Sequence, residues 1–473
     1  MLKKEAKVLL INPPYVFKES HVRKRTKGLW PPLGLLYLAA ILEKENISVK
    51  VLDLMAKGLS IEETLTLVKE TKAKVVGITG TTYQLRGMIL LGEALKDFSK
   101  QELSLVAGGS HVSADPNFIE KFPFFDFIIV GEGETTFTEL VKTILTGEKC
   151  INRVCQGKTC EDLDALPFPS RHLLDWADYS NGRYGSRFST IHSSRGCLFN
   201  CIFCSNALCG RRVRYRAPKN VVDEIEECHQ KYGSTFFIFT DDTFTLKRER
   251  VISICEEIVN RGLKIRWNCE TRANLVDEKL LSLMKNSGCE EIFFGVESGS
   301  ERIRNEVIHK QVKDEDIYNA FKVSKKLGII TNAFLMAGFP TETQAELKET
   351  FDFCFKAKPD IIGLHLTTIL PGAPIFDIAL KEGKITPNVW NDYANGKVKD
   401  QPIYVPDGLT LQDLEDFQKN LYRKFYFRPE YIIRRLKFDI KSFAQLKEDA
   451  HVAWTLLRKG RTTARSHKKE DYY

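Results

Sequence analysis

Two long stretches of this chain alternate short β-branched runs with amphipathic helical patterns, and this alternation limits the possible folds more than any other feature. In the first stretch, strand-like runs cover Lys7–Asn12, Ser48–Asp53, Lys74–Thr79, Leu103–Ala107 and Phe125–Val130. Helical patterns lie between and after them, at Leu33–Lys44, Ile61–Thr71, Tyr83–Phe98 and Thr135–Leu145. This rhythm predicts an α/β domain over residues 1–150 with a doubly wound parallel sheet. Ligands of such sheets bind beyond the carboxyl ends of the strands.

The second stretch, residues 186–385, repeats the strand and helix unit six times. Its strand candidates are Thr190–Ser194, Thr235–Phe239, Lys264–Asn268, Glu291–Phe294, Ile329–Leu335 and Asp360–Leu366. Six consecutive units predict a partial (β/α)6 barrel, in which chemistry takes place at the carboxyl ends of the strands. Residues 151–185 are then expected to be a linker and residues 386–473 a helical, basic C-terminal region. A chain of 473 residues is also longer than one hydrophobic core usually supports.

Three cysteines stand close together at the start of the predicted barrel. Cys197, Cys201 and Cys204 have the unequal spacing Cys-x3-Cys-x2-Cys. Structural zinc takes four protein ligands, and cubane iron–sulfur clusters are usually held by four cysteines. Three thiolates on one short loop therefore predict a cluster with one iron left open for a substrate or cofactor.

The other nine cysteines of the chain's twelve are expected to behave as small hydrophobic residues. Cys228, Cys255, Cys289 and Cys354 fall in apolar helical patterns, and Cys269 follows a predicted strand. Two alternatives stay open at this point. Cys150, Cys155 and Cys160 are evenly spaced and could hold a second cluster, and Cys209 lies just beyond the triplet.

The triplet resembles the cluster loop of the radical S-adenosylmethionine (SAM) superfamily, in which SAM chelates the open iron. The resemblance extends to strand-end segments around Thr240–Phe244, Glu270–Arg272 and Gly295–Ser300. It implies that the three cysteines hold a 4Fe-4S cluster. It also implies that Phe203, Asp241, Asp242, Glu270, Arg272, Glu297 and Ser298 contact SAM.

The strand-end loops of the first domain look like those of the flavodoxin-like, cobalamin-binding domain that precedes the barrel in one large subfamily. The residues that this resemblance implies for cobalamin are Asn12, Pro13, Gly80, Thr81, Gly108, Gly109, His111, Ser113, Gly131, Glu132, Gly133 and Glu134. The Asp-x-His-x-x-Gly motif that supplies a lower axial histidine elsewhere is missing after the first strand. Cobalamin is therefore expected without a lower axial histidine and without its own base on cobalt, and His111 is expected to make a loop hydrogen bond. The alternative is a vestigial domain that binds no corrin.

The resemblance implies an enzyme in which a reduced cluster cleaves SAM to a 5′-deoxyadenosyl radical. With cobalamin, the expected reaction is methylation of an unactivated carbon in a small-molecule or lipid-like substrate, with an electron from a reductant such as flavodoxin or ferredoxin. Two alternatives remain: oxidative cyclisation or rearrangement without methylation, and a non-catalytic cobalamin or metal sensor. Methylthiolation of RNA or protein is not expected, because the enzymes that catalyse it have a different N-terminal domain, whose cysteines are missing here. No loop carries a recognisable code for a base, sugar, peptide or lipid, and nucleic acid is not an expected partner.

The net charge of +8 is concentrated at the end of the chain. Residues 421–473 contain fourteen lysines and arginines against six acidic residues. This region is expected to be either a solvated helical surface or a patch for an acidic partner, including peripheral contact with a membrane. The charged N-terminus is not expected to be a secretory leader, and no run approaches the roughly twenty apolar residues of a membrane span. Together these features predict a cytoplasmic protein.

Overall fold

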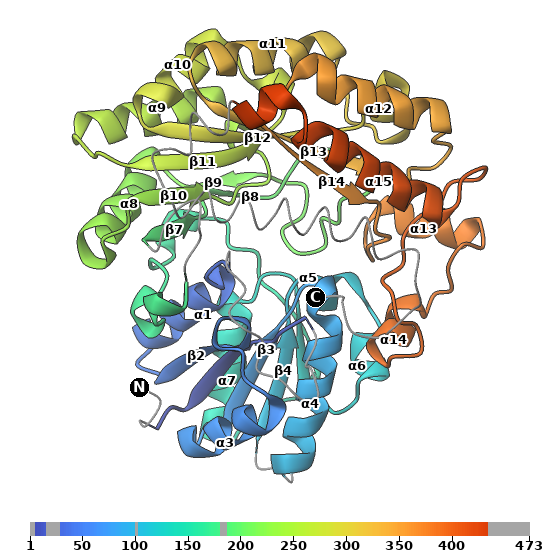
Figure 1. Cartoon of the computed structure of the whole chain (residues 1–473). Coiled ribbons are helices and arrows are strands. Elements are labelled where there is room, and N and C mark those ends of the chain that lie inside the picture. The colour runs from blue at the N-terminus through green and yellow to red at the C-terminus, as the bar shows by residue number, and fades with distance from the viewer. Residues whose placement is uncertain (1–4, 16–28, 100–102, 180–186, 434–473) are drawn as a thin grey trace. The chain divides into compact units, whose positions relative to one another are not determined.

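The structure is a computed structural model that describes residues 5–15, 29–99, 103–179 and 187–433. The chain divides into two compact units. Unit 1 consists of Met1–Thr271, Leu275–Glu291 and Thr368–Pro402, and unit 2 consists of Arg272–Asn274, Ile292–Thr367 and Ile403–Tyr473. Figure 1 shows the elements of both units.

The first sheet, in unit 1, has six parallel strands in the order β2-β1-β3-β4-β5-β6. They are β1 (Val8–Asn12), β2 (Val49–Asp53), β3 (Val75–Thr79), β4 (Ser104–Gly108), β5 (Phe127–Val130) and β6 (Val154–Gln156). Val8 pairs with both Val49 and Val75, so the strand order reverses beside β1. The predicted doubly wound sheet is confirmed. Strand β6 was not predicted; it is only three residues long and lies in the predicted linker.

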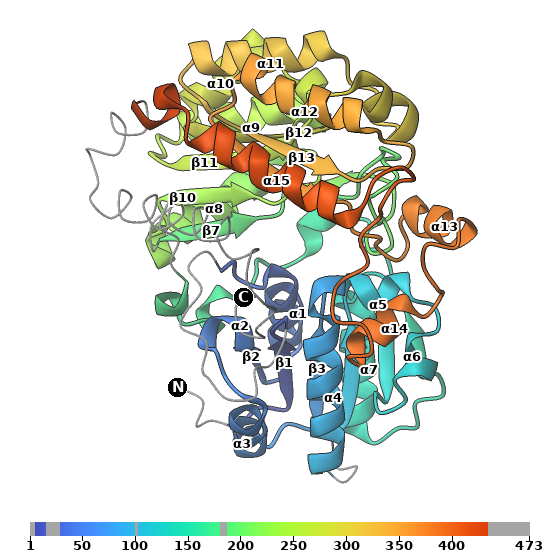
Figure 2. The same cartoon turned by 45° about the vertical axis from the view of Figure 1, so that its right-hand side comes forward.

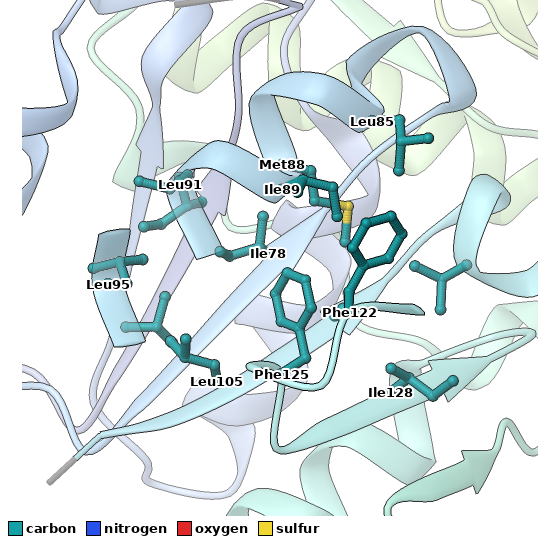
Figure 3. Packing of buried hydrophobic residues seen from close by; sticks show 14 of the residues in the cluster. Ile78, Leu85, Met88, Ile89, Leu91, Leu95, Leu105, Phe122, Phe125 and Ile128 are labelled. Atoms are coloured by element: carbon teal, nitrogen blue, oxygen red, sulfur yellow. The ribbon is translucent and has the colours of Figure 1, made fainter. Parts of the chain in front are cut away.

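Helices cover both faces of this sheet because its strands are apolar on both faces. One face packs on α1 (Leu33–Lys44) and α7 (Glu134–Thr146). The other packs on α3 (Ile61–Thr71) and α4 (Leu85–Ser99), together with the shorter α5 (Ser110–Ala114), α6 (Phe118–Lys121) and α14 (Val389–Ala394). A further short helix, α2 (Leu54–Lys57), follows β2. Figure 3 shows the α4 side of the core, where Met88 lies near Phe122. Among the described residues, both faces of the sheet are therefore packed against helices.

The second sheet has the strand order β14-β13-β12-β11-β10-β7, which follows the chain without a reversal. Its strands are β7 (Phe188–Ile191), β10 (Phe236–Phe239), β11 (Arg266–Thr271), β12 (Cys289–Glu297), β13 (Ile330–Ala337) and β14 (Ile361–Leu366). Its helices are α8 (Pro218–Tyr232), α9 (Arg248–Asn260) and α10 (Glu278–Asn286) in unit 1, and α11 (Asp314–Lys326) and α12 (Gln344–Ala357) in unit 2. A short hairpin, β8 (Ser194–Arg195) with β9 (Arg214–Tyr215), follows β7, and α13 (Pro374–Lys381) follows β14. The consecutive order agrees with the predicted six-unit partial barrel.

Three strands of this sheet, β11, β12 and β13, are longer than predicted and end later in the chain. Glu270 and Thr271 lie within β11, and Glu297 is the last residue of β12. These residues were predicted to lie in loops after the strands, because polar side chains are typical of loops. A polar residue at a strand end can continue the hydrogen-bonded ladder, and here the ladder determines the boundary.

Helix α15 (Leu411–Tyr426) lies beside the edge strand β14 of unit 2 (Figure 1), and Figure 2 shows the same helix from the turned view. The Tyr422 hydroxyl accepts the backbone N–H of Leu364 at 2.7 Å and donates to the carbonyl of the same residue at 3.0 Å. The Tyr426 hydroxyl does the same with Ile362, at 3.0 and 2.7 Å. These hydroxyls occupy backbone groups that an edge strand would otherwise leave open for pairing with another chain.

The basic residues predicted to form a C-terminal patch lie mostly at positions 434–473, outside the described residues. Within the described ranges, none of the helices has both the length and the apolar character needed to cross a bilayer.

Candidate functional site

Unit 1 contains a cavity of about 430 Å³ at the carboxyl ends of its strands. One part of its wall is made of glycines from the strands of the first sheet and the loops that follow them, namely Gly77, Gly108, Gly109, Gly131 and Gly133. Helix α1 and its approach contribute Trp30, Leu33, Gly34, Tyr37 and Leu38, and α7 contributes Phe137. The remaining wall comes from the segment around β7 and β10, with Thr190, His192, Arg195, Leu208, Cys209 and Thr240. The cavity is therefore lined by both predicted domains.

The glycines permit the close approach of the strand-end loops. Gly109 has φ +102°, and a Cβ atom there would lie 2.6 Å from the carbonyl oxygen of Gly80. Gly108 differs, because the nearest heavy atom to a Cβ would be 3.9 Å away, in Ile129. Gly109 is therefore required by the backbone, whereas the missing side chain of Gly108 leaves room in the cavity.

Of the twelve residues predicted for cobalamin, six line the cavity: Gly108, Gly109, Gly131, Glu132, Gly133 and Glu134. The other six, Asn12, Pro13, Gly80, Thr81, His111 and Ser113, are not among its lining residues. Asn12 donates to Asp53 at 2.9 Å, and Gln84 donates to Asn12 and to the carbonyl of Pro13 at 2.8 Å each. These hydrogen bonds join the ends of β1 and β2 to the segment after β3, so Asn12 and Pro13 help to order the strand-end loops. Contact of these six residues with cobalamin remains a prediction.

Ser113 joins the two glycine loops that border the cavity. Its hydroxyl donates to the carbonyl of Gly109 at 2.9 Å and accepts the backbone N–H of Gly131 at 2.9 Å. One hydroxyl therefore holds the loop after β4 against the loop after β5.

His111 lies buried behind the cavity wall. Its Nδ1 is 3.1 Å from the Thr82 hydroxyl, and the ring packs edge-on against Phe118 and Trp390. Nε2 has no hydrogen-bond partner among the described residues. Burial lowers the pKa of His111 to about 4, with Asp115 opposing the shift and Lys121 adding to it. His111 therefore makes a loop hydrogen bond and is neutral near pH 7.

This burial makes folding dependent on pH. The unfolded state takes up the His111 proton near pH 6.5, whereas the folded state resists it down to about pH 4. The free energy of unfolding is therefore expected to fall as the pH is lowered through this window, with a contribution from His111 of about 1.4 kcal/mol per pH unit. Urea unfolding of the wild type and His111→Phe between about pH 7 and pH 5 measures this slope. The variant should show a shallower slope, and equal slopes would contradict the assignment.

The cysteine loop is closed at its neck by the β8–β9 hairpin, in which Arg195 pairs with Arg214. Gly196 follows with φ +90°, where a Cβ would lie 2.5 Å from the carbonyl oxygen of Arg212. The backbone N–H of Cys204 donates to the carbonyl of Cys201 at 3.1 Å, and Cys197 Sγ lies 3.9 Å from the Thr243 hydroxyl. Cys197 and Cys201 are half-buried and Cys204 is exposed, so the three cysteines of this loop have access to solvent.

The acids predicted to bind SAM in unit 1 have different surroundings. Asp241 is buried and accepts from the backbone N–H of Ser193 at 3.2 Å, from the Ser193 hydroxyl at 2.7 Å and from the Ser194 hydroxyl. It therefore orders the segment that leads into the cysteine loop. Asp242 reaches the surface, and desolvation by its surroundings, followed by the charge of Asp241, raises its pKa. Its access to the surface, and not its pKa, makes Asp242 better suited than the buried Asp241 to the predicted ammonium contact. Glu270 is exposed and Phe203 half-buried.

In unit 2, the predicted SAM residues Glu297 and Ser298 have protein partners. Glu297 has φ +66° and accepts from Lys310 Nζ at 2.7 Å, and both side chains are buried. The Ser298 hydroxyl lies 3.1 Å from that of Thr350 and accepts the backbone N–H of Ser300 at 3.1 Å. Arg272 is buried. The contacts of all seven residues with SAM remain predictions.

The cavity residues that come from the region of the second sheet were not predicted to be site residues. Thr240 donates its hydroxyl to the carbonyl of Ile191 at 3.2 Å and lies 3.1 Å from His192 Nδ1. Both bonds can form together only if Nδ1 carries the proton, which leaves Nε2 as an acceptor. Burial lowers the pKa of His192, with the charge of Asp241 opposing the shift. The only sequence signal for His192 is its place one residue after a strand, which many loop residues share.

A strand-end cavity beside a three-cysteine loop defines an α/β enzyme that depends on cofactors. The sequence profile of the radical SAM superfamily matches residues 191–354, and that of the B12 binding domain matches residues 20–141. An uncharacterised methyltransferase of Pyrococcus horikoshii is 31% identical over 446 residues, which cover 91% of this chain and 95% of that protein. The chain belongs to the cobalamin-binding radical SAM enzymes, whose cofactors are a 4Fe-4S cluster, SAM and cobalamin.

Two further similarities are informative. The anaerobic magnesium-protoporphyrin IX monomethyl ester cyclase of Cereibacter sphaeroides is 28% identical over 426 residues, covering 85% of this chain and 68% of the cyclase. The solved structure of the radical SAM methyltransferase TsrM from Kitasatospora setae, with cobalamin and a 4Fe-4S cluster bound, has a TM-score of 0.65 at 19% identity and covers 91% of this chain and 86% of that chain. The structural similarity supports the fold.

The residues of the chain fit these cofactors. Among the described residues, no three His, Cys, Asp or Glu side chains converge to hold a single metal ion. A cubane instead takes one cysteine per iron, which suits thiols spread along one loop. The glycine-lined cavity suits a broad ligand that approaches the backbone closely. We therefore expect Cys197, Cys201 and Cys204 to hold the cluster and the cavity to receive cobalamin.

Proposed function

We propose that this enzyme methylates an unactivated carbon of a small-molecule or lipid-like substrate. The observation that supports this proposal is the cavity itself, because its wall combines the glycine loops of the B12-binding domain with strand ends of the radical SAM region. A ligand held there would face the region from which radical chemistry starts. The similarity to a methyltransferase over almost the whole chain is in line with this proposal.

When bound, the cofactors supply reductive cleavage of SAM and a transferable methyl group, and the protein orients them and excludes water. Cys197, Cys201 and Cys204 would leave one iron free for SAM. The aliphatic and aromatic lining of the cavity, including Leu38 and Phe137, would exclude water from the transferred group. A one-electron reductant such as flavodoxin or ferredoxin would complete the system.

A second candidate function is oxidative cyclisation without methylation. The similarity to the cyclase of Cereibacter sphaeroides extends over 85% of this chain, so it includes both sequence regions that line the cavity. The two functions differ in one half-reaction, because only methylation requires cobalamin to be recharged with a methyl group.

That half-reaction can be tested without the substrate. The protein would be reconstituted anaerobically, loaded with reduced cobalamin and given SAM labelled in its methyl group. We expect the label to appear in protein-bound cobalamin, and 5′-deoxyadenosine to form once a low-potential reductant is added. 5′-Deoxyadenosine without labelled cobalamin would overturn methylation and favour the cyclase alternative. The absence of both would favour a non-catalytic sensor.

A further inference from the structure

Four buried charged side chains meet beside the cavity, and we call them the anchor cluster: Glu132, Glu134, Arg195 and Arg214. Arg195 Nη2 lies 2.6 Å from Glu134 Oε1, and Arg195 Nη1 lies 3.4 Å from Glu132 Oε2. Arg214 binds both carboxylate oxygens of Glu132, with Nη1 at 2.9 Å from Oε2. Each of the four residues is at most 9% exposed. Glu132 and Glu134 were predicted to contact cobalamin, but their carboxylates are held by arginines.

The two arginines define the neck of the cysteine loop. Arg195 and Arg214 are paired across the β8–β9 hairpin, and residues 196–213 form the loop between them. All three cysteines of the predicted cluster site are in this loop. Any rearrangement of the neck would therefore be passed directly to the two guanidinium groups.

The two glutamates belong to the loop that borders the cavity. Glu132 stands between Gly131 and Gly133, and Glu134 begins α7. The Glu132 carboxylate also accepts the backbone N–H of Cys160 at 2.9 Å. Burial opposes ionisation of Glu132, but hydrogen bonds from Arg214 and from the Cys160 N–H, with the charge of Arg195, lower its pKa below the usual range. Glu132 is therefore an ionised partner of the arginines near neutral pH.

The anchor cluster also contacts helix α1 through Arg195. The Arg195 guanidinium lies over the Tyr37 ring, 5.4 Å from its centroid, and both residues line the cavity. Separating a buried pair of charges leaves an uncompensated charge and is strongly unfavourable. The neck of the cysteine loop and the rim of the cavity are therefore expected to move together rather than independently.

We propose that the anchor cluster is a positioning device that couples the two cofactor sites, so that a cluster bound on the cysteine loop strengthens binding of cobalamin in the cavity. A bound cluster orders the loop and its neck, and the arginines transmit that order to Glu132 and Glu134. Coupling between two sites is reciprocal, so cobalamin also stabilises the cluster. The proposal rests on the cofactor sites of the proposed function but not on methylation, so the labelling experiment can fail while the coupling remains.

The test measures the affinity for hydroxocobalamin by absorbance titration, with and without the reconstituted cluster. In the wild type we expect the cluster to strengthen binding at least about fivefold. Glu134→Gln keeps the size of the side chain but removes its charge, and should reduce this ratio to below about twofold. Arg195→Lys keeps the charge but lacks the guanidinium fork that reaches two carboxylates, and should reduce it in the same way.

A matched control comes from the same helix. Glu139 of α7 pairs with Lys158 at 2.6 Å, but both side chains are more than half exposed. Exposed pairs contribute little, so Glu139→Gln should keep the wild-type ratio. Circular dichroism identifies variants that do not fold, and iron content identifies variants that do not bind the iron–sulfur cluster. The test is then read from the variant of the two, Glu134→Gln or Arg195→Lys, that folds and binds the cluster. The proposal would be overturned if the wild type bound hydroxocobalamin equally well with and without the iron–sulfur cluster. It would also be overturned if a folded anchor-cluster variant kept the wild-type ratio of the two affinities.

Discussion

Replacing Cys201 with alanine is expected to reduce SAM cleavage to background and to remove the iron–sulfur cluster. Three cysteines leave one iron free for SAM. With only two cysteines, a second iron of the cluster would have no protein ligand. Iron and sulfide analysis, the absorbance of the anaerobically reconstituted protein and the yield of 5′-deoxyadenosine measure the effect. The same result is expected for Cys197→Ala and Cys204→Ala.

Cys209→Ala is the control, because Cys209 lies five residues beyond the last predicted ligand. Burial, with the charge of Glu132 adding to it, raises the pKa of Cys209 to about 11. A thiol that stays protonated is a poor metal ligand. This variant should keep its iron and sulfide. Loss of the cluster in Cys209→Ala, or its retention in Cys201→Ala, would show that the ligands have been assigned to the wrong cysteines.

Gly108→Leu is expected to weaken cobalamin binding at least about 100-fold, or roughly 2.7 kcal/mol, with little change in the free energy of unfolding. The new side chain has room, since nothing lies within 3.9 Å of its Cβ position, but it occupies the cavity. Gly108→Ala adds one carbon and should fall between the wild type and the leucine variant. Titration with hydroxocobalamin and urea unfolding give the two quantities.

Gly109→Ala provides the contrast. Its φ of +102° and the 2.6 Å approach to Gly80 mean that even a methyl group strains the backbone, so unfolding should become easier. If Gly108→Leu binds cobalamin as the wild type does, the corrin does not occupy this cavity. If Gly109→Ala is as stable as the wild type, the close approach of the loops is not required.

Most of the fold could be predicted from local pattern. The predicted bounds of α1 and α3 agree with the structure residue for residue, because the apolar spacing and flanking residues that define these helices are local. The short β6 was missed because three residues carry too little periodicity to be recognised. The ends of β11 and β12 were placed too early, since hydrogen bonding to neighbouring strands extends a strand beyond its apolar residues.

The candidate site was harder to predict, because its residues come from distant parts of the chain. Gly108 and Gly131 could be found from their place after strands. The cavity positions of His192, Thr240 and Arg195 could not be found in this way. Each of them lines the cavity only because the segment around β7 and β10 packs near the glycine loops.

By itself, the sequence determined the class of the protein: two successive α/β regions, a cluster loop recognisable from three cysteines, and strand-end loops suited to a corrin. These features depend on local spacing, which a linear sequence records. Only the tertiary structure decided what the polar residues do. In the folded chain, Glu132 and Glu134 form ion pairs with Arg195 and Arg214, and Asp241 accepts hydrogen bonds from Ser193. A buried charge is costly without a partner, and only the packing of distant segments determines which partners lie near it.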